Sequence, residues 1–174
     1  MKPIGRVTGT AISIAIALAG CQTMRTLDRP IDVHEAMTEW IDPAAVIVWS
    51  IGSRAMSEAS GSRETRMDDK SWSSLAAASE QLALSARRLA NGTTIRVGAH
   101  NDDLEGFTSG PEIQAMIDAD PDGFRRLALE AAAKSEDLTV AARMKDIQKS
   151  QELTKSLYDN CRACHSRYWE RTGG

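Results

Sequence analysis

The chain has 174 residues, enough for one ordinary domain besides any segment that is removed or serves as a linker. Its formal charge is −3 at pH 7. Taking away the first 20 residues, with Lys2 and Arg6, leaves 19 Lys and Arg against 24 Asp and Glu, a net −5. This acidic balance argues against the basic surface with which proteins bind nucleic acids.

The first 20 residues have the features of a secretory signal, with Lys2 and Arg6 before an apolar run from Ala11 to Ala19. The run is shorter than the about 20 apolar residues of a membrane span. It ends in Leu18-Ala19-Gly20-Cys21, which resembles a bacterial lipobox. The resemblance implies cleavage before Cys21, acylation of its thiol and a mature protein anchored to a bacterial membrane on the periplasmic side. The alternative is an ordinary cleaved signal.

The remaining chain divides into a short tether, residues 21–30, and one domain, residues 31–170. Apolar residues recur every three or four positions from Ile31 to about Ser57, which predicts a first helix. Asp42-Pro43 interrupts this pattern. Because Pro lacks an N–H group and clashes with the preceding turn, we expect a kink, or a restart capped by Asp42.

A second helix is predicted from Trp72 to Ala90, and Gly92 is expected to adopt the left-handed position after its end. Residues 93–120 are rich in Gly, Asp and Asn and form a long connection, briefly helical from Glu112 to Ala119. Thr93 to Val97 is the only strand-like stretch, and it is too short to build a sheet.

The last two helices begin at strong local signals. Pro121 opens the third helix, and Asp146 is the expected cap of the fourth. The domain is therefore predicted to be all-α. Four helices of about 20 residues make an antiparallel four-helix bundle the economical arrangement.

Cys161-Arg162-Ala163-Cys164-His165 is the CxxCH signature of c-type haem attachment. Each thiol forms a thioether with one vinyl group of the haem, and His165 presents an imidazole nitrogen to the iron. A CxxC dithiol or half of a zinc site is the competing interpretation. A thioredoxin-like dithiol expects a βαβ context, and structural zinc takes about four ligands, for which only His34 and His100 remain.

The pentad lies near the end of the chain, on the predicted last helix. This placement, the segment CRACHSRY and the four-helix layout resemble class II cytochromes c, the cytochrome c-prime and cytochrome c556 group. The resemblance covers Ile31 to Trp169 and implies one covalent haem c. Where many cytochromes c-prime carry a basic residue beside the axial imidazole, this chain has Trp169.

In that family a residue of the first helix faces the other side of the haem, a Met ligand in the c556 type and a noncoordinating apolar residue in the c-prime type. Met37 is the candidate here, because it lies on the apolar stripe early in the first helix and its thioether is a soft iron ligand. Filling of the core is its alternative role. His34 is a rival ligand, and His100 lies in a polar loop. Trp40, Trp49 and Trp72 are expected to pack in the core, with haem contact as the alternative.

A single covalent haem on an anchored domain predicts one-electron transfer to a redox partner rather than an enzyme. The alternative is a cytochrome c-prime-like module that binds nitric oxide or carbon monoxide. A helical interaction scaffold without haem is a third hypothesis. Because class II relatives often pair through their first two helices, a homodimer is among the implied states.

Overall fold

The computed structural model describes residues 30–59, 67–98 and 108–169. The signal segment, Cys21 and His100 lie outside these ranges. The regular secondary structure of the described residues is helical apart from two short strands, so the all-α prediction is confirmed. In chain order the elements are β1 (Ile31–Asp32), α1 (Val33–Glu35), the π-helix η1 (Ala36–Ile41), α2 (Asp42–Ala59), α3 (Asp69–Ala90), β2 (Ile95–Arg96), α4 (Gly110–Ala119), α5 (Pro121–Arg143) and α6 (Ile147–Tyr168).

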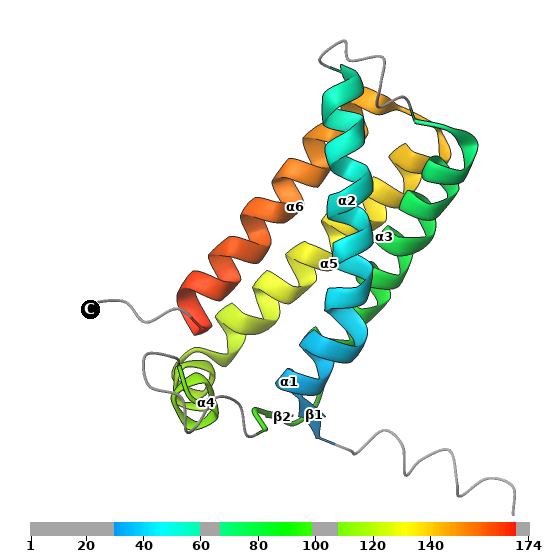
Figure 1. Ribbon diagram of the computed structural model, residues 1–174. Coiled ribbons are helices and arrows are strands. Elements are labelled where there is room, and N and C mark those ends of the chain that lie inside the picture. Colours follow the sequence, from blue (N-terminus) through cyan, green and yellow to red (C-terminus); the bar gives the residue numbers. More distant parts are fainter. Residues whose placement is uncertain (1–29, 60–66, 99–107, 170–174) are drawn as a thin grey trace, which may run out of the picture.

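The long helices α2, α3, α5 and α6 lie side by side, and each runs opposite to the one before it (Figure 1). Helix α3 packs against α5, α5 against α6, and α2 against both α3 and α6. Each of these helices therefore has two long neighbours. The short helix α4 packs against α5 and α6 at the end of the molecule where α6 finishes (Figure 1).

Carboxylate side chains start the later helices. Asp68 accepts a hydrogen bond of 2.7 Å from the Ser71 amide at the start of α3. Asp146 does the same for α6, accepting from Lys149 at 3.0 Å. Helix α5 begins at Pro121. The predicted starts of the last two helices are confirmed, because a cap and a starting Pro are local signals that tertiary packing did not override.

The first predicted helix begins later than expected, and the restart at Pro43 with Asp42 as a cap does not occur. Asp32 accepts hydrogen bonds from the amides of His34 (2.8 Å) and Glu35 (3.2 Å), so helix begins at Val33 instead of Ile31. At Pro43 the chain neither restarts nor takes Asp42 as a cap. Asp42 keeps helical dihedral angles and donates its N–H to the carbonyl of Met37, five residues earlier. The wider π turn accommodates the proline without ending the helix.

Ile31 and Asp32 instead form a parallel pair with Ile95 and Arg96, so the strand-like stretch finds its partner at the start of the domain. This pairing also explains Gly92. The expected left-handed backbone is wrong, because Gly92 does not adopt a positive φ. A Cβ at Gly92 would lie 2.6 Å from Cδ1 of Ile31, so the glycine supplies space for the strand.

Among the described non-glycine residues, Lys145 alone has a positive φ, 55°.

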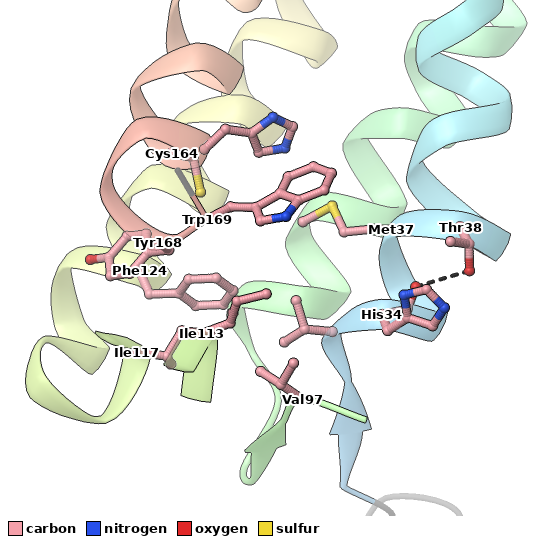
Figure 2. A pocket seen from close by; sticks show the side chains of 12 residues that line it. His34, Met37, Thr38, Val97, Ile113, Ile117, Phe124, Cys164, Tyr168 and Trp169 are labelled. Carbon is pink, nitrogen blue, oxygen red and sulfur yellow. Dashed lines mark hydrogen bonds between the residues drawn. The ribbon is translucent and has the colours of Figure 1, made fainter. Parts of the chain in front are cut away.

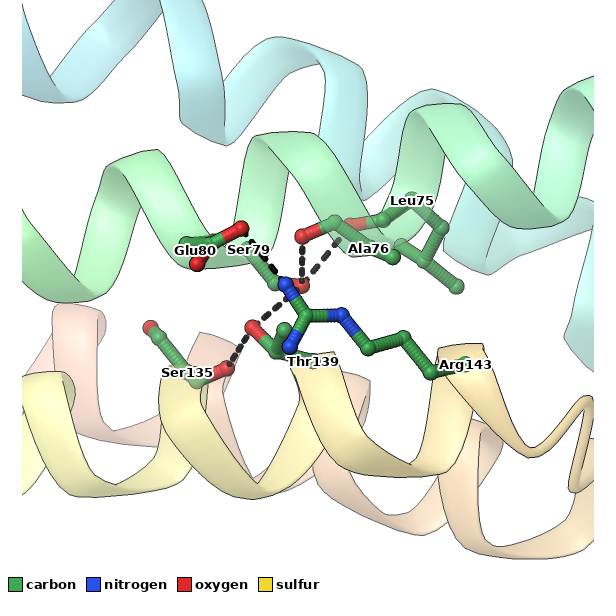
Figure 3. A network of polar contacts seen from close by, with 7 residues as sticks. All are labelled: Leu75, Ala76, Ser79, Glu80, Ser135, Thr139 and Arg143. Carbon is green, nitrogen blue, oxygen red and sulfur yellow. Dashed lines mark hydrogen bonds and ion pairs between the residues drawn. The ribbon is translucent and has the colours of Figure 1, made fainter.

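Helices α3 and α5 meet through buried hydroxyl groups (Figure 3). The Ser79 hydroxyl lies 2.7 Å from the carbonyl oxygen of Leu75, and the Thr139 hydroxyl lies 3.0 Å from the Ser79 hydroxyl and 2.8 Å from the carbonyl oxygen of Ser135. Beside this network Arg143 pairs with Glu80 at 2.7 Å. Because carbonyl groups of the two helices satisfy the hydroxyls, small polar residues can be buried at this contact.

No helix within the described ranges is long and apolar enough to cross a membrane.

Helices α2 and α6 also approach closely, at Gly52 and the buried Thr154. A Cβ at Gly52 would lie 2.5 Å from Cγ2 and 2.9 Å from Oγ1 of Thr154. We predict that Gly52→Ala lowers the free energy of unfolding by about 1–3 kcal/mol through overpacking. In an uncrowded helix the same change would stabilise by about 1 kcal/mol.

Urea unfolding of Gly52→Ala, Thr154→Ala and the double variant tests this contact. The double variant should lose clearly less stability than the sum of the single variants, because truncating Thr154 makes room for the new methyl group. Ser53→Ala, on the exposed side of the same turn, is the control. A Gly52→Ala protein as stable as the wild type would contradict the close contact.

Candidate functional site

The pentad residues lie on the last turns of α6. Cys161, Cys164 and His165 are three and four residues apart, which places their side chains on one helix face. Cys161 packs against the core cluster that contains Leu75 and Leu138, and Cys164 packs against the cluster that contains Phe124. The two thiols therefore lie where the two halves of the apolar core meet.

A cavity of about 380 Å³ opens beside this face. Its volume lies in the range of roughly 300–1,000 Å³ that is usual for small-molecule and cofactor sites. Its wall combines η1 and α2, α3, α5 and α6, and it is mostly apolar, with Thr38, Asp42, Asn160 and His165 as the polar members. The other lining residues are Met37, Ile41, Ala45, Trp49, Leu82, Ala86, Leu89, Phe124, Leu127, Ala128, Ala131, Leu157, Cys161, Cys164 and Trp169.

A smaller apolar chamber of about 100 Å³ adjoins it (Figure 2). The two cavities share Met37, Thr38, Phe124, Cys164, His165 and Trp169. Ile113 and Ile117 of α4 and Val97, just after β2, close the far wall of the chamber. The connection between α3 and α5 therefore contributes directly to the site, because its helix and strand form one wall.

Met37 and His165 approach this space from different elements. Met37 is half-buried on η1, His165 is on α6, and both line both cavities. Figure 2 shows the Met37 side chain pointing from η1 toward the end of α6. His34 lines only the smaller chamber. The structure thus brings the predicted axial histidine and the candidate distal residue to one cavity.

Burial sets the chemistry of the two thiols. It raises the pKa of Cys161 to about 11 and, together with the nearby Cys161, that of Cys164 to about 12. Both side chains are free thiols. Dithiol catalysts rely on thiolates, which form where a thiol pKa is lowered. The dithiol interpretation therefore gains no support from the raised pKa values of Cys161 and Cys164. Within the described residues no group of three or more His, Cys, Asp and Glu side chains could hold a metal ion.

Sequence reasoning missed Asn160, which is 7% exposed and lines the larger cavity. Its Nδ2 donates to Glu130 at 3.3 Å, whereas its Oδ1 has no hydrogen-bond partner. A buried acceptor without a donor indicates a site where a water or a bound group belongs. Its place directly before Cys161 was the one available sequence signal.

The tryptophans divide between core and cavity. Trp72 is buried in the core, as expected. Trp49 lines the larger cavity and packs edge-to-face on Tyr158, with 5.8 Å between ring centroids. Trp40 is half-buried beneath the guanidinium group of Arg88, 3.7 Å from its ring centroid. Of the three, Trp49 has the position for cofactor contact.

The end of α6 is fixed by Tyr168. Its hydroxyl donates to Oδ2 of Asp120 at 2.8 Å, its ring packs edge-to-face on Phe124, and Arg167 pairs with Asp120 at 2.6 Å. The Tyr168 hydrogen bond, followed by the Gly123 amide and the charge of Arg167, lowers the pKa of Asp120 below its ordinary value of 3.8. Burial and the Asp120 carboxylate raise the pKa of Tyr168 to about 12. These contacts hold the last turn of the helix that carries His165.

Comparison of the chain with protein-family models, with curated proteins and with solved structures finds no match.

Because the folded-state pKa of Asp120 is lowered, this carboxylate stabilises the fold above the unfolded carboxyl pKa of about 3.9, and the contribution is lost as pH falls through the folded value. We predict that Tyr168→Phe makes stability fall less steeply between about pH 5 and pH 2, since the largest cause of the lowered pKa is removed. Urea unfolding over this range measures the slope. Tyr158→Phe is the control, and stability curves of wild type and Tyr168→Phe that run parallel would contradict the linkage.

Proposed function

We propose that the mature chain is a lipid-anchored, periplasmic monohaem cytochrome c of the class II type, which transfers single electrons. The observation that carries the proposal is the shared cavity: Cys161, Cys164 and His165 line it from α6, and Met37 lines it from η1. A covalent haem needs two thiols beside an axial imidazole. On this face of α6, Cys164 and His165 lie three and four residues after Cys161.

The residues fit a haem in chemistry and in size. The wall is apolar apart from a few side chains, and the volume suits a cofactor. When bound, haem c supplies a one-electron iron couple. His165 would hold the iron from one side, and the apolar side chains of α3 and α5 would keep water away from the macrocycle.

Electron transfer is favoured over gas binding by Met37. A thioether on the side opposite His165 would complete the coordination, and Met with His raises the reduction potential. Met37 and His165 lie on helices that pack against neighbouring elements, so the backbone positions of both residues are fixed. A site whose ligands move little between the two redox states transfers electrons with little reorganisation.

The same proposal assigns a role to each remaining segment of the chain. The helices α2, α3, α5 and α6 would form the antiparallel four-helix bundle of the class II group, within a domain of residues 31–170. Residues 1–20 would be the signal peptide and 21–30 the tether, with a lipid on Cys21. The partner would be another redox protein at the membrane.

The second candidate is a cytochrome c-prime-like module that binds nitric oxide or carbon monoxide. The smaller chamber favours it, because this apolar space of about 100 Å³ adjoins Met37 and His165. A diatomic gas would bind in place of Met37 if the iron kept that position open.

Covalent attachment is predicted to depend on both thiols. Replacing Cys161 and Cys164 with Ala in the exported chain should abolish haem peroxidase staining on a denaturing gel, because no thioether remains. Arg162→Ala, an exposed change inside the pentad, should stain like the wild type. Staining that survives the double change would rule out this attachment.

The sixth ligand decides between the two candidates. We predict a low-spin ferric protein with the weak far-red band of iron–thioether ligation. Met37→Ala should remove that band and let the reduced protein bind carbon monoxide. Met144→Ala, which changes a methionine that is 74% exposed, should leave the spectrum unchanged. A high-spin wild type that binds carbon monoxide would favour the gas-binding candidate. A low-spin spectrum unaffected by Met37→Ala would rule out Met37 and send the search to His34 and then to His100.

A further inference from the structure

Trp169 is the residue that follows the end of α6, and its side chain lies beside the proposed axial histidine. Its indole packs edge-to-face on the imidazole of His165, with ring centroids 4.9 Å apart and an angle of 83° between the planes. The side chain is large and borders both cavities. Figure 2 shows the indole reaching from the end of α6 toward Met37. An aromatic ring from the residue that caps α6, four positions after His165, therefore packs against the imidazole.

The backbone of Trp169 is held at two points. Its N–H donates to the carbonyl of His165 at 2.8 Å, and its carbonyl accepts a hydrogen bond from the hydroxyl of the buried Thr108. Thr108 directly precedes the capping residue Ser109 of α4, so the bond ties the end of α6 to the α4 wall. The indole thus has a fixed base, although the residue as a whole is 41% exposed.

We propose that Trp169 is a positioning residue for the His165 imidazole: its indole restricts rotation of the ring and keeps water from it. The proposal rests on the function proposed above. Metal-bound imidazoles are usually oriented by a hydrogen bond from their second nitrogen, and the hydrophobic shell around the site controls solvent access and thereby tunes the redox potential of the metal. The ferric state carries one more positive charge than the ferrous state, so water near the axial ligand stabilises the ferric state and lowers the potential.

The chain offers a matched control on the same helix. Tyr158 is 49% exposed and makes an edge-to-face contact of the same kind, with Trp49 at 88°, but it lines neither cavity. Losing either ring removes one partly exposed aromatic contact of α6. The loss of Trp169 alone uncovers His165.

The test compares the reduction potentials of wild type, Trp169→Ala, Trp169→Phe and Tyr158→Ala, each exported and loaded with haem. Trp169→Ala should lower the reduction potential, because the equilibrium constant between reduced and oxidised protein shifts about three- to tenfold toward the oxidised form. A tenfold shift corresponds to about 59 mV for one electron. Trp169→Phe keeps a ring against the imidazole and should restore most of the potential, and Tyr158→Ala, whose ring packs on Trp49 and not on His165, should lower it clearly less than Trp169→Ala does. The ferric electron paramagnetic resonance spectrum should broaden in Trp169→Ala alone, since the imidazole gains freedom.

An unchanged potential in Trp169→Ala, or an equal fall in Tyr158→Ala, overturns the inference while the haem assignment stands. If Trp169→Ala does not accumulate, Trp169→Leu replaces it, and a Leu variant with both the potential and the spectrum of the wild type overturns the inference in the same way. A wild-type chain without covalent haem overturns the proposed function, and the inference with it.

Discussion

Residues of all four long helices line the larger cavity, so the packing of these helices is organised around it. Protein interiors normally pack densely, and the side chains that face this open space of about 380 Å³ have fewer neighbours than side chains in a filled core. The long helices must therefore hold one another by contacts outside the cavity, and an apolar occupant would add stability when it binds.

Those contacts lie about one helical turn beyond the cavity on each long helix. On α2, Trp49 is the last residue that lines the cavity, and Gly52 lies three residues after it. On α3, Leu82 is the first residue that lines the cavity, and Ser79 lies three residues before it. On α5 and α6 the same positions belong to Ser135 and Thr154. Small residues allow the helices to approach closely at these positions, and farther along the same helices mostly apolar side chains, four of them alanines, line the larger cavity. One set of helices thus combines a tightly packed half with a half that is open for a ligand.

Local signals made the helices predictable, and contacts between distant segments made the rest unpredictable. Pro121 and Asp146 mark helix starts through bonds within a few residues, so the sequence sufficed there. The pairing of Ile31 with Ile95, and the space it demands at Gly92, depend on residues about 60 positions apart. The site shows the same division. The spacing of Cys161, Cys164 and His165 predicted one helix face, whereas the orphaned acceptor of Asn160 follows from burial among several helices. Ligation by Met37 stays a prediction, although the structure places this residue in the same cavity as His165.

The central claim is that the cavity beside α6 belongs to a covalently attached haem. Its most direct measurement is tandem mass spectrometry of the protease-digested protein, purified after export in a host that matures c-type cytochromes. The account predicts a single haem adduct, carried by the peptide that contains Cys161 to His165. Recovery of that peptide with two free thiols, or with a disulfide between them, would contradict the account.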